Sequence, residues 1–202
     1  LAALRDVGTL SVLDVKRGDI GSTMAGYAQA YLSDGAPLAA DSITVSPYLG
    51  YGSLAPALDL AEAGGRGVFV LALTSNPEGT TVQHAVSGER AVAAEVVEGV
   101  TASNAAARGE GGLGSIGLVV GATVGEAVSR LGIDLLRANG PLLAPGVGAQ
   151  GAGATELESV FGPARRHVLA STSRGVLKAG PSIEALRAAA LAATHEAAAA
   201  LR

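Results

Sequence analysis

The sequence predicts a parallel α/β fold built from six strand–helix units. Short apolar runs alternate with longer helical patterns from one end of the 202-residue chain to the other. The runs are nearly continuous rather than alternating, which is typical of parallel strands covered on both faces. The connections between units are short, and no repeat or low-complexity linker divides the chain. We therefore expect residues 1–202 to form a single domain.

The expected strands and helices follow each other in chain order. The expected strands are Leu10–Asp14, Ile43–Val45, Val68–Leu73, Ile116–Val120, Leu142–Ala144 and Val168–Ser171. The expected helices are Thr23–Leu32, Leu54–Ala63, Ala85–Ala107, Val124–Leu131, Thr155–Phe161 and a last one from Ser182 to the end. Thr123 and Thr155 are each followed three residues later by Glu, which is capping-box spacing and predicts a helix start at each threonine.

Two architectures fit six such units. A doubly wound open sheet needs about six strands. A (β/α)8 TIM barrel needs eight strands and typically about 250 residues. The sequence begins without Met and runs directly into a strong strand. We therefore expect a TIM barrel whose first two strand–helix units are missing from the chain.

The composition excludes several classes of protein. Apolar residues make up 49% of the chain and charged residues 16%, which excludes intrinsic disorder. The net charge is −4 and the basic residues are scattered, so we expect neither a nucleic-acid nor a membrane partner. The absence of cysteine excludes disulfides and thiolate chemistry. Mean hydropathy is +0.39, but the longest uncharged stretch, 138–155, is broken by Gly and Pro and no signal peptide is visible. We expect a cytoplasmic protein.

The strongest chemical signal lies at the end of the first expected strand. Residues 11–20 read SVLDVKRGDI, an apolar run followed by an acid, a base and another acid. On an extended backbone the side chains of Asp14 and Lys16 point to the same face, at the strand end where TIM barrels hold their active sites. An ammonium held between carboxylates suits a proton donor or an electrostatic clamp, and an ion pair exposed to solvent is the alternative. Asp19 lies in the following loop, from which it can reach back to this pair or across to a neighbouring subunit.

Two segments near the C-terminus predict a phosphate site. Residues 142–151, LLAPGVGAQG, lead a strand into a Gly-rich stretch whose backbone N–H groups suit a phosphate. This stretch also matches G-x-G-x-x-G, but no acidic residue follows the next strand to hold a ribose, and a flexible loop is the alternative. Arg174 follows the next strand beside Gly175, where it suits a bidentate contact to phosphate.

The remaining polar segments carry weaker signals. Ser75 lies in a polar turn, 73–79, where it can hydrogen-bond the planar polar edge of a substrate, although an Asn-Pro turn also explains the segment. The three histidines, His84, His167 and His195, have no metal-ligand partner at a recognisable spacing. No G-x-S-x-G motif is present. We therefore expect neither a metal site nor covalent serine chemistry.

Residues 14–23, DVKRGDIGST, closely resemble the active-site signature D-x-K-R-G-D-I-G-x-T of the orotidine 5′-phosphate decarboxylase family, in its longer bacterial branch. Three further segments match in the order of that family: 73–79, 145–151 as the phosphate loop, and 173–174. The resemblance spans nearly the whole chain. Its first motif is specific, the Gly-rich loop less so, and the other two segments only support it.

The resemblance implies a (β/α)8-barrel homodimer that converts orotidine monophosphate to uridine monophosphate and carbon dioxide in pyrimidine biosynthesis, without a metal or organic cofactor. It implies that Lys16 protonates C6 of the pyrimidine and that Asp14 lies against the substrate carboxylate. The other implied roles are these: Asp19, Ile20 and Thr23 act at the ribose end of the partner's site, Ser75 contacts the pyrimidine, and Gln150, Ser173 and Arg174, with backbone amides near Gly148, hold the phosphate.

The resemblance also implies an Asp on the first barrel strand and a Lys on the second, and both would precede Leu1. Three alternatives stay open. A Mg²⁺-dependent sugar-phosphate decarboxylase or hexulose-phosphate synthase of the same superfamily shares D-x-K-x-x-D. A non-catalytic domain that binds phosphorylated ligands is the second alternative. A nicotinamide-binding protein rests on G-x-G-x-x-G alone.

Overall fold

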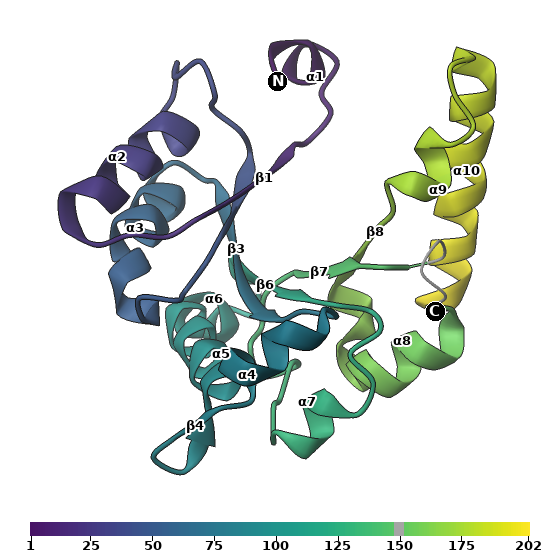
Figure 1. Cartoon of the computed structure of the whole chain (residues 1–202). Coiled ribbons are helices and arrows are strands. Elements are labelled where there is room, and N and C mark those ends of the chain that lie inside the picture. The colour runs from purple at the N-terminus through teal and green to yellow at the C-terminus, as the bar shows by residue number, and fades with distance from the viewer. Residues whose placement is uncertain (148–151) are drawn as a thin grey trace.

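The computed structural model describes residues 1–147 and 152–202 and contains one parallel sheet of six strands (Figure 1). The strands are β1 Val12–Arg17, β2 Ser42–Val45, β3 Gly67–Leu73, β6 Ile116–Val120, β7 Leu142–Pro145 and β8 Val168–Ser171. They lie side by side in the order β1-β2-β3-β6-β7-β8. Successive strands of a TIM barrel are neighbours in this way, whereas a doubly wound sheet reverses its order. The expected arrangement, six units of a TIM barrel, is confirmed.

The helices between the strands cover one side of the curved sheet. Helices α2, α3, α5 and α8 lie along its outer side, and α9 and α10 stand beyond β8 (Figure 1). The helices are α1 Ala2–Asp6, α2 Gly21–Leu32, α3 Ala55–Ala63, α4 Thr80–Gln83, α5 Val92–Ser103, α6 Ala105–Gly109, α7 Ala127–Arg130, α8 Ala154–Phe161, α9 Arg174–Leu177 and α10 Ile183–Ala200. The core between helices and sheet contains fully buried Met24, Leu32, Leu54, Leu118 and Leu157.

The single helix expected over Ala85–Ala107 is wrong at both ends. A hairpin precedes the helix, formed by β4 Val86–Ser87 and β5 Arg90–Ala91. Its two-residue turn begins at Gly88, whose φ of 66° suits glycine at the first position of a type II′ turn. At the other end Asn104 separates α5 from α6, and its buried amide donates to the backbone carbonyls of Ile116 and Ala138, both at 2.8 Å.

Neither expected capping box forms. After β6 the helix α7 begins only at Ala127, with Glu126 in the capping position, so Thr123 starts no helix. Gly125 has a φ of 59°, a left-handed conformation that delays the helix beyond the expected Val124. Helix α8 is capped by Gly153, whose N–H donates to Glu156 Oε2 at 2.8 Å, and Thr155 lies inside its first turn.

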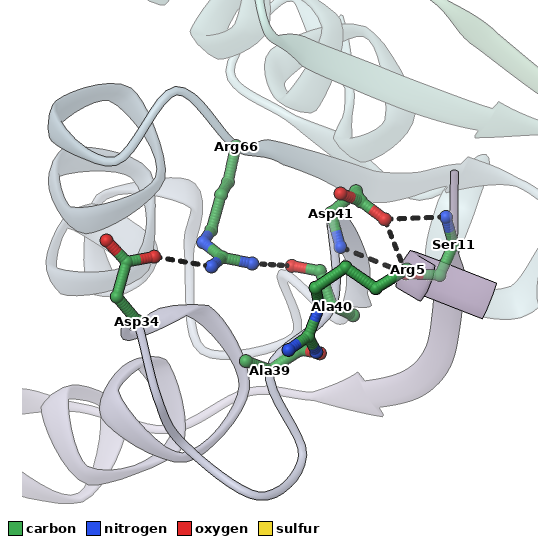
Figure 2. A network of polar contacts seen from close by, with 7 residues as sticks. All are labelled: Arg5, Ser11, Asp34, Ala39, Ala40, Asp41 and Arg66. Atoms are coloured by element: carbon green, nitrogen blue, oxygen red, sulfur yellow. Dashed lines mark hydrogen bonds and ion pairs between the residues drawn. The ribbon is translucent and has the colours of Figure 1, made fainter. Parts of the chain in front are cut away.

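A polar network ties together the amino ends of β1, β2 and β3 (Figure 2). The carboxylate of Asp41, just before β2, accepts hydrogen bonds from the backbone N–H and the hydroxyl of Ser11, just before β1, at 2.8 and 2.7 Å. Arg66, just before β3, donates to the carbonyl of Ala40 and to Asp34. The network fixes where the three strands begin.

The Asp41 contacts predict a pH-dependent contribution to stability. The hydrogen bonds from Ser11 hold the pKa of Asp41 below its ordinary value. A carboxylate whose pKa is lower in the folded than in the unfolded state stabilises the fold. Its contribution is complete when the pH lies above the ordinary pKa of about 3.9, and it is lost as the pH falls through the pKa of the folded state. Urea unfolding between about pH 6 and pH 2.5 is therefore expected to show a smaller loss of stability on acidification in Asp41→Asn than in the wild type. Asp59→Asn, on the exposed face of α3, is the control and is expected to lose as much stability on acidification as the wild type. An equal loss of stability on acidification in all three proteins would contradict a stabilising role for the Asp41 carboxylate.

Candidate active site

The predicted site residues that the structure describes lie at the carboxyl edge of the sheet. Because all six strands run in the same direction, the residues that end them share one edge. Asp14 and Lys16 belong to the end of β1, Ser75 follows β3, and Ser173 and Arg174 follow β8. This edge is opposite the one that holds the Asp41 network.

The end of β1 is irregular. Leu13 pairs with Ile43 and Arg17 with Val45, so Asp14, Val15 and Lys16 face a single residue of β2. Lys16 has a φ of 46°, in the left-handed region that a lysine rarely adopts. The backbone is thus not extended through the motif, as the sequence interpretation assumed. The side chains of Asp14 and Lys16 nevertheless meet, and Lys16 Nζ forms an ion pair with Asp14 Oδ2.

Thr44 of β2 contacts both members of this pair and was missed by the sequence analysis. Its hydroxyl donates to Asp14 Oδ1 at 2.7 Å and accepts from the backbone N–H of Lys16 at 3.0 Å. Partial burial raises the pKa of Asp14, but the hydrogen bonds from Lys16 and Thr44 and the charge of Lys16 outweigh it, so the pKa lies below its ordinary value. The carboxylate therefore stays charged beside the ammonium. Such a fixed pair can stabilise a developing negative charge and supply a proton.

The loop after β1 turns sharply against β2. A Cβ at Gly18 would lie 2.2 Å from the carbonyl oxygen of Ser46, so only glycine fits there. Asp19 Oδ1 accepts from the N–H of Ile20 at 2.8 Å, just before α2 begins. Ile20 is 62% exposed and Thr23 is exposed in the first turn of α2. In the part of the chain that the structure describes, no hydrogen bond or ion pair joins Asp19 to Asp14 or Lys16.

Ser75 is exposed in the turn after β3. The turn is held by Gln83 of α4, whose amide oxygen accepts from the N–H of Thr74 at 2.9 Å and whose amide nitrogen donates to the Thr74 hydroxyl at 2.7 Å. A Cβ at Gly121, at the end of β6, would lie 3.2 Å from the backbone nitrogen of Ser75. Close packing of the two strand ends thus fixes where Ser75 lies along the edge.

The predicted phosphate residues follow β7 and β8. Gly146 has a φ of 98°, and Val147 and Ala152 form a bridge across the loop. Gln150 and Gly148 lie outside the described residues. Pro145 and Ser171 are paired in register, which brings the end of β7 beside the end of β8, just before α9. Ser173 occupies the position before α9 without a side-chain capping hydrogen bond, and Arg174 is the exposed first residue of the helix.

Residues 1–147 and 152–202 contain neither a cluster of metal ligands nor a helix that could span a membrane. No group of three His, Cys, Asp or Glu side chains there could hold a metal ion. In the same residues no helix is long and apolar enough to cross a membrane.

Comparison with known proteins gives one family. The orotidine 5′-phosphate decarboxylase / HUMPS family matches residues 1–189. The chain is 60% identical over 188 residues to orotidine 5′-phosphate decarboxylase of Salinispora arenicola and 59% identical over 188 residues to that of Streptomyces coelicolor. The alignments cover 93% and 92% of this chain, which spans 65% of the length of each relative.

Two solved structures are also similar. The crystal structure of a Streptomyces avermitilis protein superposes with a TM-score of 0.91 at 56% identity, covering 99% of this chain and 68% of that one. Leishmania donovani OMP decarboxylase gives a TM-score of 0.73 at 32% identity, covering 99% and 74%. On the match of residues 1–189 and on these similarities, the chain belongs to the orotidine 5′-phosphate decarboxylase / HUMPS family.

Proposed function

We propose that this chain carries the proton-donating half of an orotidine 5′-monophosphate decarboxylase site. The Asp14–Lys16 ion pair at the carboxyl end of β1 is the observation that carries the proposal. It supports a reaction in which negative charge develops on the substrate next to a fixed ammonium. The 60% identity to a curated orotidine 5′-phosphate decarboxylase supports the substrate, orotidine monophosphate, and the products, uridine monophosphate and carbon dioxide.

The proposed reaction uses the two charges differently. The bond between C6 and the carboxylate carbon breaks, carbon dioxide leaves, and the electron pair stays on C6. Lys16 stabilises this charge and then donates a proton to C6, after which its neutral amine takes a proton from water. Asp14 repels the substrate carboxylate, and this repulsion disappears when carbon dioxide leaves. Neither step requires a metal or an organic cofactor.

The remaining contacts of the substrate follow from the order of the strands. Ser75, after β3, is proposed to contact the pyrimidine edge. Ser173 and Arg174 are proposed to hold the phosphate together with Gln150, and the pairing of Pro145 with Ser171 supports a site shared by the two loops. Binding energy from a phosphate at a distance from C6 can keep the reacting end of the site closed and poor in water.

The proposal is tested by decarboxylation of orotidine monophosphate by the purified protein, followed as loss of orotate absorbance with a chelator present. Turnover that resists the chelator would support it. Turnover that the chelator abolishes would favour a Mg²⁺-dependent relative. No turnover by the 202-residue chain would remove the catalytic proposal for this chain, and binding of uridine monophosphate would then favour a domain that only binds phosphorylated ligands.

Lys16→Ala is expected to reduce turnover by at least about 10²–10⁴-fold, the range of a lost proton donor. Binding of uridine monophosphate, measured by calorimetry, is expected to change little because the phosphate contacts remain. The chain has only one other lysine, Lys178, which follows α9. Lys178→Ala is the matched control and is expected to keep its turnover. Undiminished turnover in Lys16→Ala would exclude Lys16 as the proton donor.

Arg174→Ala is expected to weaken binding of uridine monophosphate by about 1.5–3 kcal/mol, the range for a hydrogen bond to a charged group. Binding of uridine, which lacks the phosphate, is expected to stay the same. Arg187→Ala, on the exposed face of α10, removes an equal charge and should leave both affinities unchanged. If uridine weakens as much as the nucleotide, Arg174 does not bind the phosphate.

We further propose a homodimer in which each copy supplies Asp19, Ile20 and Thr23 to the partner's site. Ile20, Tyr48 and Leu49 follow the neighbouring strands β1 and β2 and are 62%, 77% and 52% exposed, which supports an interface at this edge.

Leu49→Asp is expected to shift the protein from dimer to monomer in sedimentation velocity, because it places a charge in this surface. Leu38→Asp is the control, because Leu38 is equally exposed, at 50%, but precedes β2 at the opposite edge. A wild-type monomer, or a dimer that survives Leu49→Asp, would contradict this interface.

A further inference from the structure

The hydrogen-bond ladder between β1 and β2 is interrupted at the Asp14–Lys16 pair. Three residues lie between Leu13 and Arg17, whereas only one lies between their partners Ile43 and Val45. β1 therefore carries two extra residues at this point, a bulge of the kind found beside active sites. The ladder resumes where the N–H of Ser46 donates to the carbonyl of Arg17 at 2.8 Å.

The side chain of Thr44 replaces the missing ladder bonds. The backbone N–H of Lys16 can only donate, so Thr44 Oγ1 accepts from it and must direct its own hydrogen to Asp14 Oδ1. The other oxygen of Asp14 accepts from Lys16 Nζ. These contacts form a closed ring through the backbone of Lys16, the hydroxyl of Thr44, the carboxylate of Asp14 and the ammonium of Lys16.

The position of Thr44 gives no structural reason for a hydroxyl apart from this ring. Thr44 is 1% exposed, and its neighbours along β2, Ile43 and Val45, are buried as well. Its neighbour in register on β3 is Phe69. Valine has nearly the same shape and suits such a strand, whereas a buried hydroxyl costs free energy unless it is hydrogen-bonded.

We infer that Thr44 is the positioning residue of the Asp14–Lys16 pair: its hydroxyl fixes the rotation of the carboxylate and the left-handed backbone of Lys16, and through both it fixes the direction of the ammonium. The inference rests on the proposed function of that pair. Without the hydroxyl, Asp14 Oδ1 loses its donor and the Lys16 N–H loses its acceptor. The carboxylate can then rotate, and the ammonium no longer has a single orientation toward the reacting atom.

The test compares Thr44→Val, which removes only the hydroxyl, with Thr44→Ser, which keeps it. Thr101→Val is the matched control, because Thr101 is also buried but its hydroxyl donates only to Val97 of its own helix. Three quantities are measured in each protein: the pKa of Asp14 by NMR of its carboxyl carbon, the hydrogen exchange rate of the Lys16 amide, and kcat and KM for orotidine monophosphate.

In Thr44→Val the pKa of Asp14 is expected to rise and the Lys16 amide to exchange at least about tenfold faster than in the wild type. kcat is expected to fall by about 10–100-fold, as for a misplaced catalytic group, while KM changes far less. Thr44→Ser is expected to restore all three quantities toward wild type, and Thr101→Val to leave them unchanged.

Three results would overturn the inference. In the first, Thr44→Val leaves the Asp14 titration and the Lys16 exchange rate at wild-type values. In the second, Thr44→Ser loses as much as Thr44→Val, so that the hydroxyl is not the group that acts. In the third, the NMR quantities shift but kcat does not. A wild type without turnover would instead contradict the proposed function, and the two NMR measurements would still decide whether Thr44 positions the pair.

Discussion

The parallel direction of six consecutive strands is the constraint on which the rest of the structure depends. Parallel pairing gathers all carboxyl ends at one edge, so Lys16, Ser75 and Arg174 reach the same side of the sheet although they are far apart in the sequence. It also gathers all amino ends at the other edge. There the charged groups of Asp41 and Arg66 bind backbone N–H and carbonyl groups and fix the entry of the strands. The polar groups of the amino edge thus stabilise the fold, whereas the charges of Asp14 and Lys16 at the carboxyl edge remain half exposed.

Two of the strands that lead into candidate site residues, β1 and β3, are irregular near the carboxyl edge. β1 shifts its register between Leu13 and Arg17, and β3 shifts between Leu71 and Leu73, just before the turn that holds Ser75. In contrast, β2 pairs with β3, and β7 with β8, residue by residue. A bulge changes the direction of the side chains that follow it. The irregular ends of β1 and β3 therefore direct the polar groups of Asp14, Lys16 and Ser75, whereas Ser173 and Arg174 follow a strand whose pairing is regular.

This division explains what the sequence could predict. The six strands were visible because a strand buried on both faces is a nearly continuous apolar run. Lys16 was visible because a lysine is rare in this chain and stands at the end of such a run. Thr44 gave no signal, because a threonine within the strand sequence SITV is an ordinary strand residue until the bulge of the neighbouring strand is known. The hairpin at Gly88 could have been predicted from the Ser87-Gly88 pair, which is typical of a turn. The sequence on both sides has a helical composition, however, and therefore favoured one continuous helix.

The exposure of the ion pair explains why its orientation matters more than its strength. The side chains of Lys16 and Asp14 are 52% and 58% exposed, and an ion pair in contact with water contributes little to stability. The same two charges interact much more strongly with a substrate once water is excluded, because the effective dielectric constant falls. In the proposed reaction and the proposed dimer, covering the carboxyl edge with substrate or with a second copy of the chain would therefore strengthen the interaction of these charges with the reacting atoms. The interaction helps the reaction only if the ammonium already points at the reacting atom. The hydroxyl of Thr44 can fix this direction because it is buried, so water does not compete for its hydrogen bonds to Asp14 and Lys16.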